Sequence, residues 1–229
     1  MKINFDTMKY YYLTTGNNKK RENHMEDIFK NYNIKKIIGP SGIKKHISGA
    51  IGHSKMIELG LREQDRNKPF QPFVILEDDV SFFRNLPNEL EIPDNTDALY
   101  IGISPWGLNK DNMQGKYNHI IADDYNDDLI KVYNMLGLHA VIVCSSLYAS
   151  VYTRSMMESI YYIKDRGDWD IILSTLQKKY NVYAFKNPFL YQDAKYGGQE
   201  TTKVILNTFI KYDKKLLVDD IFMNNIISL

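Results

Sequence analysis

One short stretch constrains this chain most, because in residues 73–80 an apolar run ends in three successive carboxylates, Glu77, Asp78 and Asp79. Apolar runs of this length suit strands that helices cover on both faces of an α/β sheet. In open α/β sheets, ligands bind outside the carboxyl ends of the strands. Adjacent carboxylates repel one another, so the run predicts a bound divalent cation, with Mn²⁺ or Mg²⁺ favoured by hard oxygen ligands. The alternative is a strand that runs into a solvated acidic turn.

Composition excludes several other classes of protein. The 229 residues contain 29 Lys and Arg against 28 Asp and Glu, so no net field indicates a nucleic acid or an anionic membrane as partner. The single cysteine, Cys144, rules out an internal disulfide and suits a reducing compartment. No signal peptide and no apolar run of membrane-spanning length is evident, so we expect a soluble, cytoplasmic protein.

Strand-like and helix-like segments alternate along the chain. This alternation predicts one α/β domain over residues 1–229, a mainly parallel sheet with helices on both faces. Strands are expected near residues 10–14, 37–38, 73–76, 98–103, 138–143 and 182–185. Helices are expected near residues 25–32, 48–61 and 169–176.

Three segments fit this alternation less well. Residues 104–127 have no clear period and are expected to form a long loop that is either functional or mobile. The tail, residues 204–229, is expected to be a helix that packs on the core or forms a dimer contact, and the oligomeric state stays open. The acidic cluster at residues 123–128 is a rival metal site, but no apolar strand precedes it, so we interpret it as a solvated turn.

Several short motifs, in order, resemble the sugar transferases of glycosyltransferase family 25, which includes lipooligosaccharide and collagen galactosyltransferases. The main ones are the glycine-rich residues 49–54 and the strand end at residues 74–80. The chain also looks like glycosyltransferases of giant DNA viruses, for which the location would be the host cytoplasm. Two features depart from the family pattern: His53 and Ser54 stand in reversed order, and no histidine follows His139. Further matches lie at residues 98–102, 139–143, 168–169 and 182–191.

This resemblance implies a GT-A fold, a Rossmann-like sheet that binds a nucleotide-diphosphate sugar together with Mn²⁺ or Mg²⁺. Residues 1–103 would form the nucleotide-sugar half and residues 104–229 the acceptor half. The expected donor is a UDP-sugar and the expected acceptor a glycan or a protein hydroxyl, with inversion at the transferred sugar. Asp79 would then bind the metal, and Glu77 or Asp78 would contact the ribose or the donor sugar.

Two further assignments follow from the resemblance. Asp193 would replace the missing late histidine as a metal ligand. The loop at residues 197–202 would close over the diphosphate.

The nucleotide itself is expected at the end of the first strand. Thr14 and Thr15 offer hydroxyls there, and Arg21 lies near a helix N-terminus, where the helix dipole favours anions. The alternative for this basic segment is a solvated loop. His53 lies on the helix before the acidic strand and is expected to face the donor pocket, although a lone histidine is more often structural. We interpret His139 as structural.

The catalytic base is expected in the pair Asp168 and Asp170, which flank Trp169 at a helix start. The alternative for Asp168 is a helix cap, and for Trp169 a place in the core. Two other functions remain open from the sequence. One is a metal-dependent phosphohydrolase acting on nucleotide sugars, and the other is a nucleotide-sugar-binding module that has lost catalysis.

Overall fold

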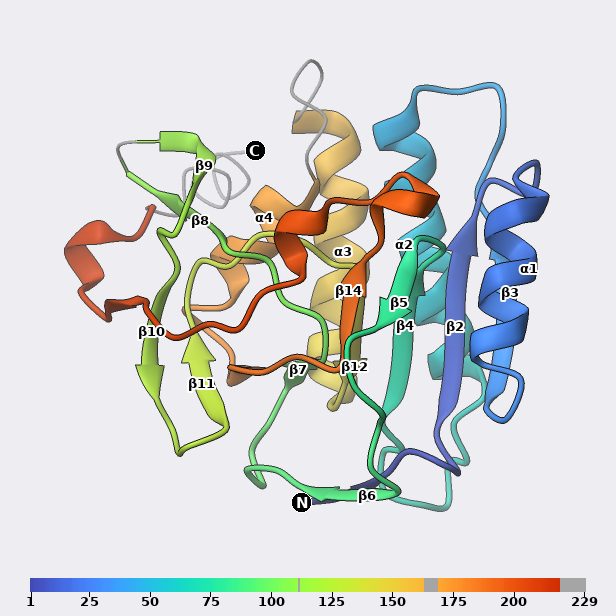
Figure 1. Cartoon of the computed structure of the whole chain (residues 1–229), viewed down its shortest axis with the longest axis horizontal. Coiled ribbons are helices and arrows are strands. Elements are labelled where there is room, and N and C mark those ends of the chain that lie inside the picture. The colour runs from blue at the N-terminus through green and yellow to red at the C-terminus, as the bar shows by residue number, and fades with distance from the viewer. Residues whose placement is uncertain (111, 163–168, 219–229) are drawn as a thin grey trace.

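The computed structural model describes residues 1–110, 112–162 and 169–218. Its centre is a nine-stranded sheet with the order β15-β10-β11-β13-β7-β12-β4-β2-β3 (Figure 1). The strands of this sheet are β2 (Lys9–Thr14), β3 (Asn33–Ile38), β4 (Phe73–Glu77), β7 (Ala98–Tyr100), β10 (Ile121–Asp124), β11 (Leu129–Val132), β12 (Ala140–Val143), β13 (Val182–Phe185) and β15 (Ile210–Lys211).

The sheet is mixed, whereas we expected a mainly parallel one. β2 runs parallel to β3 and β4, and β7 runs parallel to β13, but β12 is antiparallel to both of its neighbours, β4 and β7. A parallel neighbour needs a crossover connection, usually a helix. The described chain between β7 and β12 contains strands instead, including β8 (Trp106–Asn109) and β9 (Asn112–Tyr117). It returns to the end of the sheet at which β7 finishes, so β12 runs back antiparallel to β7.

Helices cover both faces of the sheet. α1 (Lys19–Ile28) lies on one face, and α2 (Lys45–Arg62), α3 (Ser146–Tyr162) and α4 (Trp169–Leu176) lie on the other. The alternation of β2 shows why its three tyrosines are all buried. Tyr10 and Tyr12 pack in the core beneath α1, whereas Tyr11 points to the opposite face, where its ring centroid lies 5.8 Å from that of Phe73.

Short strands complete the face that α1 occupies. β1 (Lys2–Asn4) pairs with β6 (Glu89–Glu91), and β5 (Val80–Phe82) pairs with β14 (Leu190–Gln192). The β5–β14 pair continues directly from β4 and holds the start of residues 193–203 beside the end of that strand. This segment contains the short helices η1 (Ala194–Tyr196) and η2 (Glu200–Thr202). No helix in the described ranges is long and apolar enough to cross a membrane.

Three expectations about secondary structure were wrong. Residues 104–127 form β8, β9 and β10 instead of a long loop. α3 was not expected at all, although its buried Tyr148, Tyr152 and Met156 repeat at a spacing of four residues. Residues 204–218 contain β15 and the short helix η3 (Lys214–Leu216) and no α-helix, and the rest of the tail lies outside the described residues.

The C-terminal end of α2 is tied to the sheet by Glu63. Its carboxylate accepts hydrogen bonds from Lys35 Nζ at 2.6 Å and from Tyr11 Oη at 3.0 Å, and Lys9 Nζ lies 3.1 Å away. Burial by itself would raise the pKa of Glu63, but these partners outweigh it and lower the pKa to about 2. The ionised carboxylate therefore stabilises the fold above its unfolded pKa, near 4.3.

We expect Glu63→Gln to lower the free energy of unfolding at pH 7 by about 1 kcal/mol, a value reduced for solvent screening at this partly exposed site. The difference from the parent should shrink as pH falls from about 4 towards 2, because the parent then loses the charge. Urea unfolding at neutral and acidic pH measures this. Glu58→Gln is the control, since Glu58 is exposed and lies 3.7 Å from Arg62. A pH-independent difference would contradict the assignment.

Candidate functional site

A cavity of about 500 Å³ lies at the carboxyl ends of β2 and β4. The end of β2, the first turn of α1, the start of α2, the end of β4 and the segment after β14 all contribute to its wall. The structure therefore brings together most of the residues that the sequence indicated. Its lining includes Thr14, Thr15, Arg21, His53, Glu77, Asp78 and Asp79.

The three carboxylates at the end of β4 have different environments. Asp78 forms an ion pair with Arg21, with 2.6 Å between Oδ1 and Nη1. Asp79 is buried, and its Oδ1 has no hydrogen-bond partner among the described residues. Burial, together with the negative charge of Glu77, raises the pKa of Asp79 to about 7. The charge of Arg21 and a contact with Gln192 lower the pKa of Asp79 only in part, since the ion pair of Arg21 is with Asp78.

Two side chains, an amide and an imidazole, contact the carboxylate of Glu77. Gln192 Nε2 donates a hydrogen bond to its Oε2 at 3.1 Å, and His53 Nε2 lies 3.6 Å from its Oε1. Burial raises the pKa of Glu77, but the contact with His53 outweighs burial, and the pKa lies below its ordinary range. Glu77 therefore carries the negative charge that disfavours ionisation of Asp79.

Asp79 fits a hard cation better than a purely structural role. An unpartnered buried carboxylate oxygen is costly, and a divalent ion would satisfy it and offset the repulsion from Glu77. Within the described ranges, no group of three or more His, Cys, Asp or Glu side chains is arranged to hold a metal. An ion at Asp79 would therefore need oxygen atoms from a bound ligand to complete its coordination.

His53 is fully buried, and its Nδ1 lies 2.9 Å from the hydroxyl oxygen of Tyr152 on α3. This contact fixes the ring with Nε2 towards Glu77. His139 is also buried and does not line the cavity. Burial lowers the pKa of His139 to about 4, so its ring is neutral at physiological pH. The His53 side chain therefore supports the acidic strand end, whereas His139 contacts it through its backbone carbonyl, which accepts a hydrogen bond from Glu77 N.

The first turn of α1 supplies the positive side of the cavity. Asn18 caps the helix, because its side chain accepts a hydrogen bond from the backbone N–H of Arg21. Thr14 Oγ1 accepts a hydrogen bond from Gly16 N at 3.3 Å, which shapes the turn between β2 and α1. Hydroxyls and a guanidinium therefore face the cavity next to a helix N-terminus, an arrangement suited to anions.

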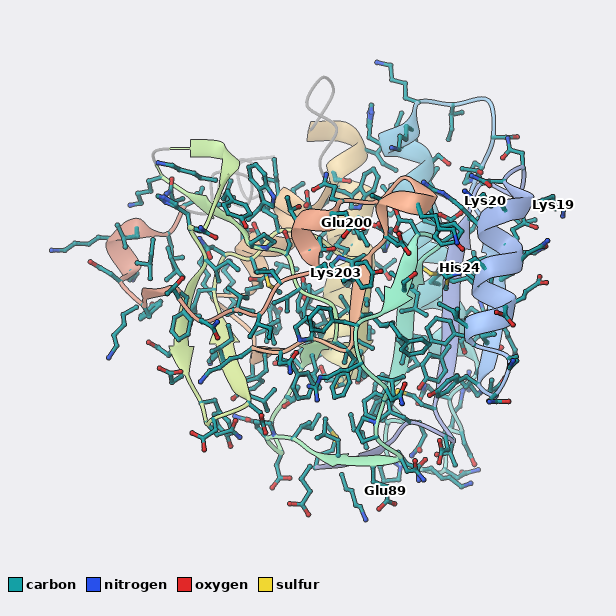
Figure 2. The ribbon with its side chains drawn as sticks, viewed as in Figure 1. Lys19, Lys20, His24, Glu89, Glu200 and Lys203 are labelled. Carbon is teal, nitrogen blue, oxygen red and sulfur yellow. The ribbon has the colours of Figure 1, made fainter. Side chains whose placement is uncertain are left out.

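Residues 193–203 cover one side of the cavity. Gly197, Gly198 and Gln199 line it. The segment is fastened to α1, since the rings of His24 and Tyr196 stack with centroids 3.8 Å apart and Lys20 Nζ donates to the carbonyl of Lys195 at 3.1 Å. Figure 2 labels Lys20 and His24 on α1. It also labels Glu200 and Lys203, which lie in the later part of residues 193–203.

Asp193 has a different environment from the one expected of a metal ligand. Its Oδ1 accepts a hydrogen bond from Lys195 N, and its Oδ2 accepts hydrogen bonds from Ser81 Oγ at 2.9 Å and Tyr191 Oη at 3.5 Å. It is not among the residues that line the cavity. Asp193 is thus the cap of η1, and its role as a metal ligand stays a prediction.

A second cavity of about 320 Å³ adjoins the first. Asp170 lines it, and its Oδ2 accepts a hydrogen bond from Gly137 N at 2.9 Å. Asp168, the other residue expected to act as base, lies outside the described residues. Four residues line both cavities: Glu77, Trp169, Gln192 and Gln199.

Trp169 forms part of the wall between the cavities because α2 approaches it closely. A Cβ atom on Gly49 would lie 2.3 Å from the indole ring, so only glycine fits there without a shift.

Two lining residues of the second cavity, Ser104 and Trp106, were not singled out from the sequence, since they lie in the stretch that we expected to be a loop. Gln199 belongs to the segment that we expected to close over a diphosphate, and it lines both cavities. The only available signal was Trp106 between Pro105 and Gly107, an aromatic residue in a polar, turn-rich segment.

Comparison with known proteins adds little. Neither a protein-family model nor a curated protein sequence matches this chain, so the resemblance to glycosyltransferase family 25 stays a prediction. Among solved structures, the chain is similar to a glycosyltransferase involved in the glycosylation of the major capsid of PBCV-1. The identity is 8%, the TM-score is 0.42, and the match covers 90% of this chain and 82% of that chain. A likeness this distant carries no argument about the site.

The unequal partners of the two aspartates give a direct test. In metal-free buffer with a chelator, Asp79→Asn should raise the free energy of unfolding by about 1 kcal/mol, because it removes a buried charge repelled by Glu77. Asp78→Asn should lower it by about 1–3 kcal/mol, because it leaves Arg21 without its partner. Denaturant unfolding of both variants measures the contrast. Equal effects of the same sign would show that the charges are not distributed as described.

Proposed function

We propose that this chain is a metal-dependent glycosyltransferase that uses a nucleotide-diphosphate sugar, with a UDP-sugar as the preferred donor. The observation that carries the proposal is the juxtaposition within one cavity of an anion-binding side, Thr14, Thr15 and Arg21, and the acidic side at the end of β4. A diphosphate joined to a sugar needs both, because its phosphates require positive partners while its hydroxyls favour carboxylate acceptors.

Asp79 would hold Mn²⁺ or Mg²⁺, since it has a buried oxygen with no partner among the described residues. When bound, the ion would neutralise the diphosphate as negative charge develops on it. Arg21 would contact the phosphates or the base, and Glu77 or Asp78 would accept hydrogen bonds from hydroxyls of the ribose or the sugar. His53 would act on this reaction indirectly, by orienting Glu77.

The adjoining second cavity favours transfer over hydrolysis. A phosphohydrolase needs room only for water next to the donor, whereas this chain has about 320 Å³ of further space that meets the donor cavity at Glu77 and Trp169. An acceptor placed there would bring a hydroxyl next to the donor sugar. Holding both reactants in one geometry is the main means by which such a site would accelerate the reaction.

Asp170 is the described carboxylate best placed to act as general base, because it lines the acceptor side. In an inverting transfer, the acceptor oxygen bonds to the anomeric carbon and the bond from that carbon to the diphosphate oxygen breaks. The electron pair of the broken bond stays on the diphosphate, and the hydroxyl proton passes to the base.

Asp79→Asn should abolish Mn²⁺-dependent binding of UDP and UDP-sugars while the fold is retained. Isothermal titration calorimetry with and without Mn²⁺ measures this, and circular dichroism checks the fold. Asp127→Asn is the matched control, since Asp127 belongs to the rival acidic cluster and should leave binding unchanged. Undiminished, Mn²⁺-dependent affinity in Asp79→Asn would remove the metal role from this residue.

Asp170→Asn should bind UDP and Mn²⁺ normally but lose turnover by about a hundred- to ten-thousand-fold. The amide oxygen can still accept the hydrogen bond from Gly137 N, so the local fold should persist. Product analysis by mass spectrometry, with and without candidate acceptors, gives the measurement. Near-normal transfer would place the base elsewhere and reopen a retaining mechanism. Release of free sugar independent of acceptor would indicate a hydrolase, and tight binding without turnover in the parent would indicate a binding module.

A further inference from the structure

Both tryptophans of the chain line the second cavity. Trp106 lies on β8 and Trp169 lies at the start of α4. Both side chains are half-buried, so part of each indole surface is open.

Packing fixes both rings. Trp169 lies against Gly49 of α2, and its ring centroid is 6.1 Å from that of His53. The ring of Trp106 meets Tyr117 edge-on at 5.7 Å, and its backbone carbonyl accepts a hydrogen bond from Leu136 N at 2.9 Å. The cavity is therefore bordered by rigid aromatic surfaces that need little reordering to bind a ligand.

The two cavities differ in the charged residues that line them. The donor cavity is lined by Arg21 and Lys45 in addition to its carboxylates. The charged residues that line the second cavity are Glu77 and Asp170, and no Lys or Arg of the described chain is among its lining. A phosphate or carboxylate in the second cavity would lie near the carboxylates of Glu77 and Asp170, with no Lys or Arg in the lining that the structure describes.

We propose that the second cavity binds a neutral saccharide, so that the acceptor is a sugar hydroxyl and not a hydroxyl of a protein or of an anionic sugar. This inference rests on the proposed function, because it names the acceptor class of the same site. A pyranose ring has an apolar face of C–H groups and a rim of hydroxyls. Tryptophan surfaces suit the face, and Ser104, Asp170 and Gln199 offer hydrogen-bonding groups for the rim.

The size of the cavity agrees with this class of ligand. A volume of about 320 Å³ corresponds to roughly ten water molecules at their liquid density. One sugar ring with its hydroxyls needs a space of this order, while further residues of a glycan would extend into solvent.

The two tryptophans make occupancy measurable without turnover. In Trp169→Phe, the remaining indole is Trp106, which lines the second cavity and not the first. Its fluorescence should change on titration with methyl β-glucoside or methyl β-galactoside, with dissociation constants on the order of 1 mM. Methyl β-glucuronide, the same ring with a carboxylate, should bind about fivefold more weakly or worse. Titrations are run with and without UDP and Mn²⁺.

A second experiment removes the aromatic surface of Trp106. Trp106→Leu should weaken binding of the neutral glycosides about tenfold when measured by ligand-observed NMR, while Trp106→Phe, which keeps an aromatic face, should weaken it less. UDP binding to each variant shows that the donor cavity is intact.

The outcomes separate this inference from the proposed function. If UDP binds with Mn²⁺ but neutral glycosides give no response in either condition, the inference is overturned and the proposed function stands. Equal or tighter binding of the glucuronide also overturns it, as does transfer to a serine- or threonine-containing peptide in place of a sugar. Binding of neutral glycosides without any binding of UDP supports the saccharide site and contradicts the proposed donor.

Discussion

Repulsion among the three carboxylates at the end of β4 is the constraint around which the rest of the site is built. Each of the contacts that relieve it comes from a different element: Arg21 from α1, His53 from α2 and Gln192 from β14. The contact of His53 with Tyr152 extends this support to α3. Charge compensation at one strand end therefore ties together elements that are distant in sequence, and it explains why polar groups are buried at this point in an otherwise apolar core.

The negative charges of the three carboxylates are not all compensated by neighbouring side chains. Asp78 has a guanidinium partner, and Glu77 has an imidazole and an amide, but the buried Oδ1 of Asp79 has none among the described residues. A purely structural site would be expected to satisfy every buried carboxylate, since an unpaired one costs free energy. This oxygen belongs to a residue that lines the cavity of about 500 Å³, which makes Asp79 a candidate for contact with a ligand.

How much the sequence could predict depended on how local the signal was. β13 and α4 were predicted at their observed bounds because continuous apolar runs and helical spacing are local. Thr14 ends β2 and Asp79 follows β4, two strands recognised in this way, whereas α1 begins before the expected helix and includes Arg21. The direction of β12, the strands within residues 104–127 and the second cavity depend on where the chain returns in space, which no local pattern encodes. For Asp193, the acidity was visible in the sequence but its hydrogen bonds to Ser81 and Lys195 were not, because these too depend on where distant segments meet.

The glycine-rich start of α2 now has a physical explanation. A Cβ atom on Gly49 would strike Trp169, and one on Gly52 would lie 2.3 Å from Leu13 at the end of β2, so both glycines let α2 lie directly against its neighbours. That close approach brings His53, the next residue, within 3.6 Å of Glu77. The same contact with Trp169 forms part of the wall between the two cavities. The spacing of α2 from the sheet and from α4 thus sets both the charge on the acidic strand end and the width of the space on either side of Trp169.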